Sequence, residues 1–169
     1  MHLETKNLII RDFKMSDAED YYEVAKDERV GPNCNWDVHP SVQYTKKVIK
    51  MYRKHKDTFA ICLKTGEVIG NVQLYKDKSR VDTYEIGYCI HPIYWNNGFA
   101  TEVCKKIIDY YFTFVNCHTV TALVKDDNLA SIRVLEKNGF VKEGTLYSAR
   151  KDIKARYIDC VSYSLVNKK

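Results

Sequence analysis

The chain has 169 residues, of which 45% are hydrophobic and 29% are charged, with a formal net charge of +5 at pH 7. These proportions are those of an ordinary globular protein and predict one domain over residues 1–169. The positive charge suits a polyanionic ligand but is far below that of a nucleic-acid-binding domain, and no apolar run approaches the roughly 20 residues that cross a bilayer. With no apolar segment at the N-terminus either, we expect a cytoplasmic protein with no nucleic-acid or membrane partner.

The first third of the sequence predicts a strand and two helices. Leu8–Phe13 has the composition of a strand, and Ser16-Asp17-Ala18-Glu19 has the Ser and Glu spacing of a capping box that opens a helix ending near Lys26. Gly31–Asp37 is rich in residues that favour turns and predicts a loop. A second helix is expected from Ser41 to about Lys56.

This second helix carries a run of basic side chains, namely Lys46, Lys47, Lys50, Arg53 and Lys54. Such a run on a helix is commonly a solvated face. The alternative is a docking surface for an acidic acceptor, and the sequence leaves both open.

The middle of the chain predicts a hairpin, a strand and then a long helix. Phe59–Leu63 and Val68–Tyr75 flank a Lys-Thr-Gly turn, which is a signal for a hairpin. In the next segment the large apolar residues at 84, 86, 88 and 90 alternate with Glu85, Gly87 and Cys89, which is the period of a strand. The period then becomes that of an amphipathic helix, whose apolar stripe consists of Ala100, Val103, Cys104, Ile107 and Tyr111.

The last third predicts three more strands and a short helix. Thr119–Val124 is expected to be a strand, and a helix follows Asn128. Phe140–Tyr147 and Tyr157–Leu165 predict a pair of strands, and the charged segment between them, Ser148–Arg156, predicts a loop.

Between the central strand and the long helix lies a tight turn, Asn96-Asn97-Gly98, of residues that tolerate left-handed backbone. The first N–H groups of a helix have no partner within it, so a turn of small residues there lets a phosphate approach them. The turn is neither a Walker loop, which needs Gly-Lys-Ser/Thr, nor a Rossmann fingerprint, which needs more glycines. On these grounds a phosphate site and an ordinary strand–helix connection both stay open.

A second informative stretch runs from Asn128 to Phe140. Asn128 is a suitable N-cap, Leu129, Ile132 and Leu135 share a helical stripe, and Gly139 stands where a glycine commonly ends a helix. Any short helix could use these residues, so the pattern alone assigns no function.

Together the two stretches resemble the cofactor motifs of the GNAT superfamily of N-acetyltransferases. Trp95-Asn96-Asn97-Gly98-Phe99-Ala100-Thr101-Glu102 resembles its acetyl-CoA loop, in the form found in the branch of the ribosomal-protein N-terminal acetyltransferases, and Asn128-x-x-Ser131 with Glu-Lys-x-Gly-Phe resembles the second motif. Asn96 replaces the glycine most often found there, which could alter the turn. The resemblance implies a single-domain α/β (α+β) fold, with a mixed central sheet of about six to seven strands flanked by helices and with splayed central parallel strands.

The same resemblance implies an enzyme that transfers an acetyl group from acetyl-CoA directly to a primary amine in a ternary complex. The acceptor would be a protein N-terminus or a small amine, and the protein a monomer or a homodimer. The residues that would bind the cofactor are Ile90, through its backbone N–H, and Trp95, Asn96, Asn97, Gly98, Phe99, Ala100, Thr101, Asn128 and Ser131. The alternative is a non-catalytic module that binds and senses acyl-CoA.

Two residues, Glu85 and Ser131, are candidates for catalysis on the strength of the resemblance, and His91 is considered beside them for its ordinary pKa near neutrality. Glu85 is the candidate general base, with an ordinary surface ion pair as the alternative, and His91 beside Pro92 is either a second candidate base or a turn residue. Ser131 is expected to hydrogen-bond the departing thiolate, with a purely local bond as the alternative. The tyrosine that many relatives use as an acid is excluded, because Leu135 stands in its place.

For the remaining candidates a binding role and a structural role are both considered. Asn128 would bond the pantetheine and cap its helix at once, and Tyr88, Tyr94 and Trp36 either line the acceptor pocket or belong to the core. The six cysteines are scattered without a Cys-x-x-Cys pair, so we expect reduced, buried thiols and no metal site.

Overall fold

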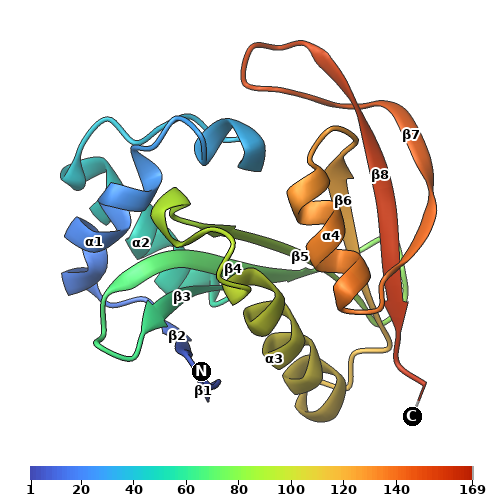
Figure 1. Ribbon diagram of the computed structural model, residues 1–169, viewed down its shortest axis with the longest axis horizontal. Helices are drawn as coiled ribbons and strands as arrows, with labels where there is room; N and C mark the ends of the chain where they lie inside the picture. Colours follow the sequence, from blue (N-terminus) through green and yellow to red (C-terminus); the bar gives the residue numbers. More distant parts are fainter. Residues whose placement is uncertain (169) are drawn as a thin grey trace.

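One mixed β-sheet organises residues 1–168, the part of the chain that the computed structural model describes (Figure 1). Its eight strands lie in the order β1-β2-β3-β4-β5-β6-β8-β7. Neighbouring strands are antiparallel except β5 and β6, which are parallel. The strands are β1 (His2–Glu4), β2 (Leu8–Asp12), β3 (Thr58–Leu63), β4 (Val68–Lys76), β5 (Thr83–Ile90), β6 (Thr119–Lys125), β7 (Val141–Lys151) and β8 (Tyr157–Val166).

Helices cover both faces of the sheet (Figure 1). Helices α1 (Ala18–Ala25) and α2 (Val42–His55) pack on one face, and α3 (Phe99–Phe114) and α4 (Leu129–Lys137) pack on the other. Three short 3-10 helices, η1 (Met15–Asp17), η2 (Gly31–Cys34) and η3 (Pro92–Tyr94), lie in the connections. None of the helices in residues 1–168 combines the length and the apolar character that a membrane span requires.

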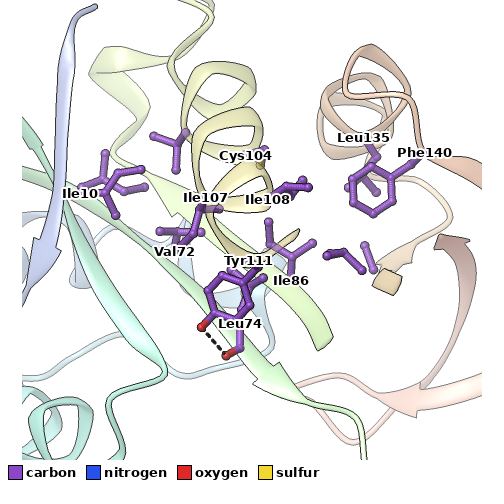
Figure 2. Packing of buried hydrophobic residues seen from close by; sticks show 14 of the residues in the cluster. Ile10, Val72, Leu74, Ile86, Cys104, Ile107, Ile108, Tyr111, Leu135 and Phe140 are labelled. Carbon is purple, nitrogen blue, oxygen red and sulfur yellow. Dashed lines mark hydrogen bonds between the residues drawn. The ribbon is translucent and has the colours of Figure 1, made fainter. Parts of the chain in front are cut away.

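The core under α3 follows the predicted apolar stripe. Cys104, Ile107 and Tyr111 are buried against Leu74 of β4 and Ile86 of β5, and Leu135 and Phe140 extend this cluster toward α4 (Figure 2). Because large apolar residues alternate along β5, their side chains all enter this cluster while Cys89 points to the opposite face. The helical and strand periods read from the sequence are therefore confirmed.

The opposite face is packed with aromatic side chains and with the thiol of Cys89. Tyr21 of α1 donates a hydrogen bond to Asn71 Oδ1 at 2.9 Å, and Cys89 Sγ donates to the same oxygen at 2.8 Å. His39, in the connection between α1 and α2, is buried with its Nδ1 2.9 Å from Thr45 Oγ1. Five of the six cysteines are buried, as expected, and Cys34 is half-buried.

The predicted helices and hairpins are confirmed, but three details were wrong. The first helical segment begins after Lys14, where the Asp17 carboxylate accepts from Lys14 N–H and pairs with Arg11, so the Ser16–Glu19 capping box does not form. The sheet has one strand more than expected, because the three residues of β1 are too few to show a pattern. β7 continues to Lys151, so residues 148–151 of the predicted loop of residues 148–156 belong to this strand.

The buried His39 predicts a dependence of stability on pH. Burial lowers the pKa of His39 below its ordinary value of 6.5, so the unfolded chain binds a proton more readily than the native one. The free energy of unfolding should therefore fall as the pH drops from 7 through 6.5 toward the lowered pKa. We expect His39→Gln to reduce this slope in urea titrations at several pH values.

The exposed His118 provides the matched control, since His118→Gln should leave the slope as it is in the parent protein. An equal slope in the parent and in His39→Gln would contradict the assignment.

Candidate active site

The two parallel strands of the sheet separate soon after they begin. β5 and β6 pair only at Thr83↔Thr119, Tyr84↔Val120 and Glu85↔Thr121. Beyond Glu85, β5 continues along β4 and β6 continues along β8, so the sheet opens between residues 86–90 and 122–125. We call this opening the splay; it confirms the splayed central strands expected from the sequence.

Backbone groups of β5 face the splay. His91 N–H donates to Ile69 O and Asp77 N–H donates to Thr83 O, which fixes the alternation of the antiparallel ladder between β4 and β5. The N–H groups of residues 84, 86, 88 and 90 then point away from β4, toward β6. At Ile90 the carbonyl on this side accepts from Trp95 Nε1 at 2.7 Å, and the N–H lies at the open end of the splay.

The turn before α3 keeps the left-handed backbone that the sequence suggested. Asn96 has φ 64° and Gly98 has φ 76°, so asparagine retains the conformation that glycine would favour. Asn97 Nδ2 braces the turn by donating to the carbonyls of Tyr94 and Trp95, both at 3.1 Å. Asn96 therefore adopts a left-handed backbone that glycine would also adopt.

Within residues 1–168, the first backbone N–H groups of α3 have no hydrogen-bond partner. Gly98 is the N-cap and has no side chain to cap the helix, and Phe99, Ala100 and Thr101 follow it. The Glu102 carboxylate, which could have capped the helix, instead accepts from Asn7 N and Nδ2, both at 2.8 Å. A Cβ atom on Gly98 would meet no atom within 4 Å, so the space on that side of Gly98 is open.

The start of α4 forms the second wall of the site. Asn128 Oδ1 accepts from Ser131 N–H at 3.2 Å, so Asn128 caps the helix as predicted. The Ser131 hydroxyl lies 2.9 Å from the hydroxyl of Tyr88, which also donates to Ser131 O at 3.2 Å. Burial raises the pKa of Tyr88 well above its ordinary value, so this phenol stays neutral at physiological pH. Leu135, one turn further on, is buried in the core.

Glu85 lies on the other side of β5, away from Ser131. Its Oε1 accepts from Tyr75 OH at 2.7 Å and from Arg150 Nη2 at 2.9 Å, and the side chain is 21% exposed. Burial, together with the Glu85 carboxylate, raises the pKa of Tyr75. Within residues 1–168, Oε2 of Glu85 takes part in no hydrogen bond, so one carboxylate oxygen is left for a ligand.

The other candidates have structural partners. His91 Nδ1 accepts from Ile93 N–H at 3.4 Å and so shapes the turn into η3. Tyr94 donates to Glu67 at 2.8 Å, and Trp36 packs against His39 with ring centroids 5.3 Å apart. Of the three aromatic residues considered for the acceptor pocket, Tyr88 alone bonds to a candidate catalytic residue.

Sequence reasoning missed three residues of the site. Arg150 and Tyr75 hold Glu85 from β7 and β4, and Cys34 Sγ lies 3.9 Å from Tyr88 O beside the splay. The Arg150 contact spans 65 residues, and no local pattern could have indicated it. The contact between Tyr88 and Ser131, at the start of the Asn128-capped helix, could be recognised only once the order of the strands was known.

Comparison with known proteins assigns the chain to a class. The family profile described as "Acetyltransferase (GNAT) domain" matches residues 7–141. An uncharacterized N-acetyltransferase of Bacillus subtilis (strain 168), YnaD, is 32% identical over 145 residues, which cover 85% of each chain. The chain therefore belongs to the GNAT acetyltransferase family and is an N-acetyltransferase.

Solved structures of this family share the fold. The ribosomal-protein-S5-alanine acetyltransferase of Vibrio fischeri superposes with a TM-score of 0.85 at 22% identity and covers 100% of this chain and 98% of its own. The spermidine N-acetyltransferase of Vibrio cholerae, solved with CoA and spermine, gives a TM-score of 0.83 at 20% identity and covers 98% of both chains.

Proposed function

We propose that this N-acetyltransferase uses acetyl-CoA and transfers the acetyl group directly to a primary amine within the splay. The observation that carries the proposal is that β5 and β6 pair over three residues and then part, with the open N-terminus of α3 beside them. Such an opening admits a long, narrow chain between two strands, and free helix donors bind a phosphate group. The CoA bound in the spermidine N-acetyltransferase structure supports the same choice of donor.

The cofactor contacts follow from the free groups of the site. The pyrophosphate would lie against the backbone N–H groups of the turn and first helical turn, residues 96–101, beside Trp95. Asn128 uses Oδ1 for its cap, which leaves its Nδ2 for a carbonyl of the pantetheine arm. The Ile90 N–H at the open end of the splay would hold the thioester oxygen as negative charge develops there.

Proton removal from the amine and departure of the thiolate take place on opposite sides of β5. On the side of Glu85 the amine loses its proton to Oε2, directly or through water, as its nitrogen attacks the thioester carbon. On the other side the carbon–sulfur bond breaks, and the Ser131 hydroxyl donates a hydrogen bond to the departing thiolate. Tyr88 holds that hydroxyl in place. Two substrates would thus meet from opposite faces of the sheet, as direct transfer requires.

The acceptor is either a protein N-terminus or a small amine, as in the ribosomal-protein and spermidine acetyltransferases that share the fold. Calorimetric titration with acetyl-CoA, followed by assay of thiol release with N-terminal peptides and polyamines, tests the proposal. We expect micromolar acetyl-CoA binding and turnover with one acceptor class. The absence of acetyl-CoA binding would refute it.

Gly98→Glu should weaken acetyl-CoA binding by at least tenfold, about 1.4 kcal/mol, because it places a carboxylate against the phosphate donors. Calorimetry measures the effect. Gly66→Glu is the matched control, since Gly66 also has a positive φ and open space around its Cβ position but lies in the β3–β4 turn. Equal affinities in the two variants would argue against the assignment of the turn.

Ser131→Ala should lower kcat about 10- to 100-fold, the effect of one hydrogen bond to a charged group. The affinity for acetyl-CoA should change little, because the bond strengthens only as the thiolate leaves. Steady-state kinetics and calorimetry separate the two quantities. A fall in affinity with kcat unchanged would instead assign Ser131 to binding alone.

Glu85→Gln should lower kcat/KM by about 100-fold or more across the pH range, because the amide cannot accept the proton. The pH–rate profile is the measurement. Glu143→Gln is the control, because Glu143 is also a strand glutamate and pairs with Arg80 at the surface. A profile for Glu85→Gln that matched the parent would exclude Glu85 as the base.

A further inference from the structure

The outward face of α2 is strongly basic. Thr45 and Ile49 are fully buried, and at 100° per residue the opposite side of the helix is centred on Lys47 and Lys54. One flank of this side carries Lys46, Lys50 and Arg53, and the other carries the exposed apolar side chains of Tyr44 (46% exposed) and Met51 (49%). We call these seven residues the α2 face.

The positive charges of the α2 face repel one another, and among residues 1–168 they form no ion pair with a carboxylate. Helix α2, residues 42–55, contains no acidic residue, and its lysines stand three and four residues apart, where like charges destabilise a helix. Within residues 1–168, no ion pair involves any of its five cations. Basic residues elsewhere do find carboxylates, among them Lys26, Arg80, Lys125 and Arg150.

The α2 face is connected to the side of the splay that bears Glu85. The ring centroids of Tyr44 and His39 lie 5.0 Å apart, and those of His39 and Trp36 lie 5.3 Å apart. The same α1–α2 connection carries Cys34, whose Sγ lies beside Tyr88 at the splay. A bound chain leaving the acceptor side of the site along this connection would therefore reach the N-terminal half of α2.

We propose that the α2 face docks an acidic segment of a protein acceptor whose amino terminus enters the splay. This inference rests on the proposed function and narrows its acceptor to a protein rather than a polyamine, since five unpaired cations repel a polycation. Tyr44 and Met51 supply apolar contacts at the edge of a charged surface, which is the arrangement of a protein interface. Two apolar side chains on one flank are too few for the wide apolar face of a membrane-bound helix.

The test uses the full chain and a dye-labelled peptide with a free N-terminal alanine, followed by a segment rich in Glu and Asp with two leucines. A matched peptide carries Gln and Asn in place of the acids. Binding is measured by fluorescence anisotropy at low and raised ionic strength, for the parent and for Lys47→Gln/Lys50→Gln/Lys54→Gln. Gln is a good helix former, so this variant keeps the helix while losing the charge.

We expect the parent to bind the acidic peptide more tightly than the neutral one, with an affinity that falls as salt is raised. The triple variant should bind the acidic peptide about tenfold more weakly, as three exposed ion pairs are lost. The control, Lys78→Gln/Lys142→Gln/Lys168→Gln, removes three exposed lysines outside α2 and should bind like the parent.

Equal binding of the two peptides, or equal losses in the test and control variants, would overturn the docking surface. So would α2-dependent sedimentation with phosphatidylserine vesicles in the absence of peptide discrimination, which would assign the face to a membrane. Titration with acetyl-CoA separates this inference from the proposed function. Failure of acetyl-CoA binding with intact peptide discrimination refutes the enzyme mechanism alone, and normal acetyl-CoA binding without discrimination refutes the docking surface alone.

Discussion

The geometry of the site depends on which neighbouring strands form backbone hydrogen bonds with β5 and β6. β6 pairs with β8 over all of its residues and β5 pairs with β4 over nearly all of its length, but β5 and β6 pair with each other only at their first three residues. Beyond that point the inner edges of both strands carry backbone donors and acceptors without a ladder partner. Unpaired backbone groups inside a protein are costly, and here they are the groups that a ligand chain would satisfy. Pairing these backbone groups with each other would stabilise the sheet, whereas leaving them unpaired keeps them available to a ligand.

Because side chains alternate between the two faces of a strand, the two candidate groups carried by β5 point to opposite sides of the sheet. Tyr88 and Glu85 lie three residues apart on β5, and because of the pleat their side chains leave from opposite faces. Tyr88 reaches across to Ser131 and ties β5 to α4 on one side of the splay, while Glu85 is held by Tyr75 and Arg150 on the other. Neither contact requires a loop to be ordered, since every one of these residues belongs to a strand or a helix. Residues on strands and helices are positioned more precisely than residues on loops.

Features encoded in short stretches could be predicted from the sequence, and contacts between distant segments could not. The apolar stripe of α3, the alternation of β5 and the left-handed residues Gly98 and Gly139 are local, and they were placed correctly. The Ser16 capping box failed because Arg11, a residue of another element, fixes Asp17 instead. The insertion of β8 between β6 and β7, which brings Arg150 to Glu85, is a matter of strand order. The roles of Glu85 and Ser131 themselves stay predictions.

Arg150 has a further consequence, because it comes from the C-terminal hairpin of β7 and β8. The family profile matches the chain up to residue 141, at the start of β7, so the matched part contains the turn, Asn128 and Ser131, and Arg150 lies beyond it. The hairpin thus supplies a charged partner to Glu85 from a segment outside the matched region. A change at Arg150 would therefore alter the charge next to Glu85 while leaving the backbone donors at the start of α3 in place.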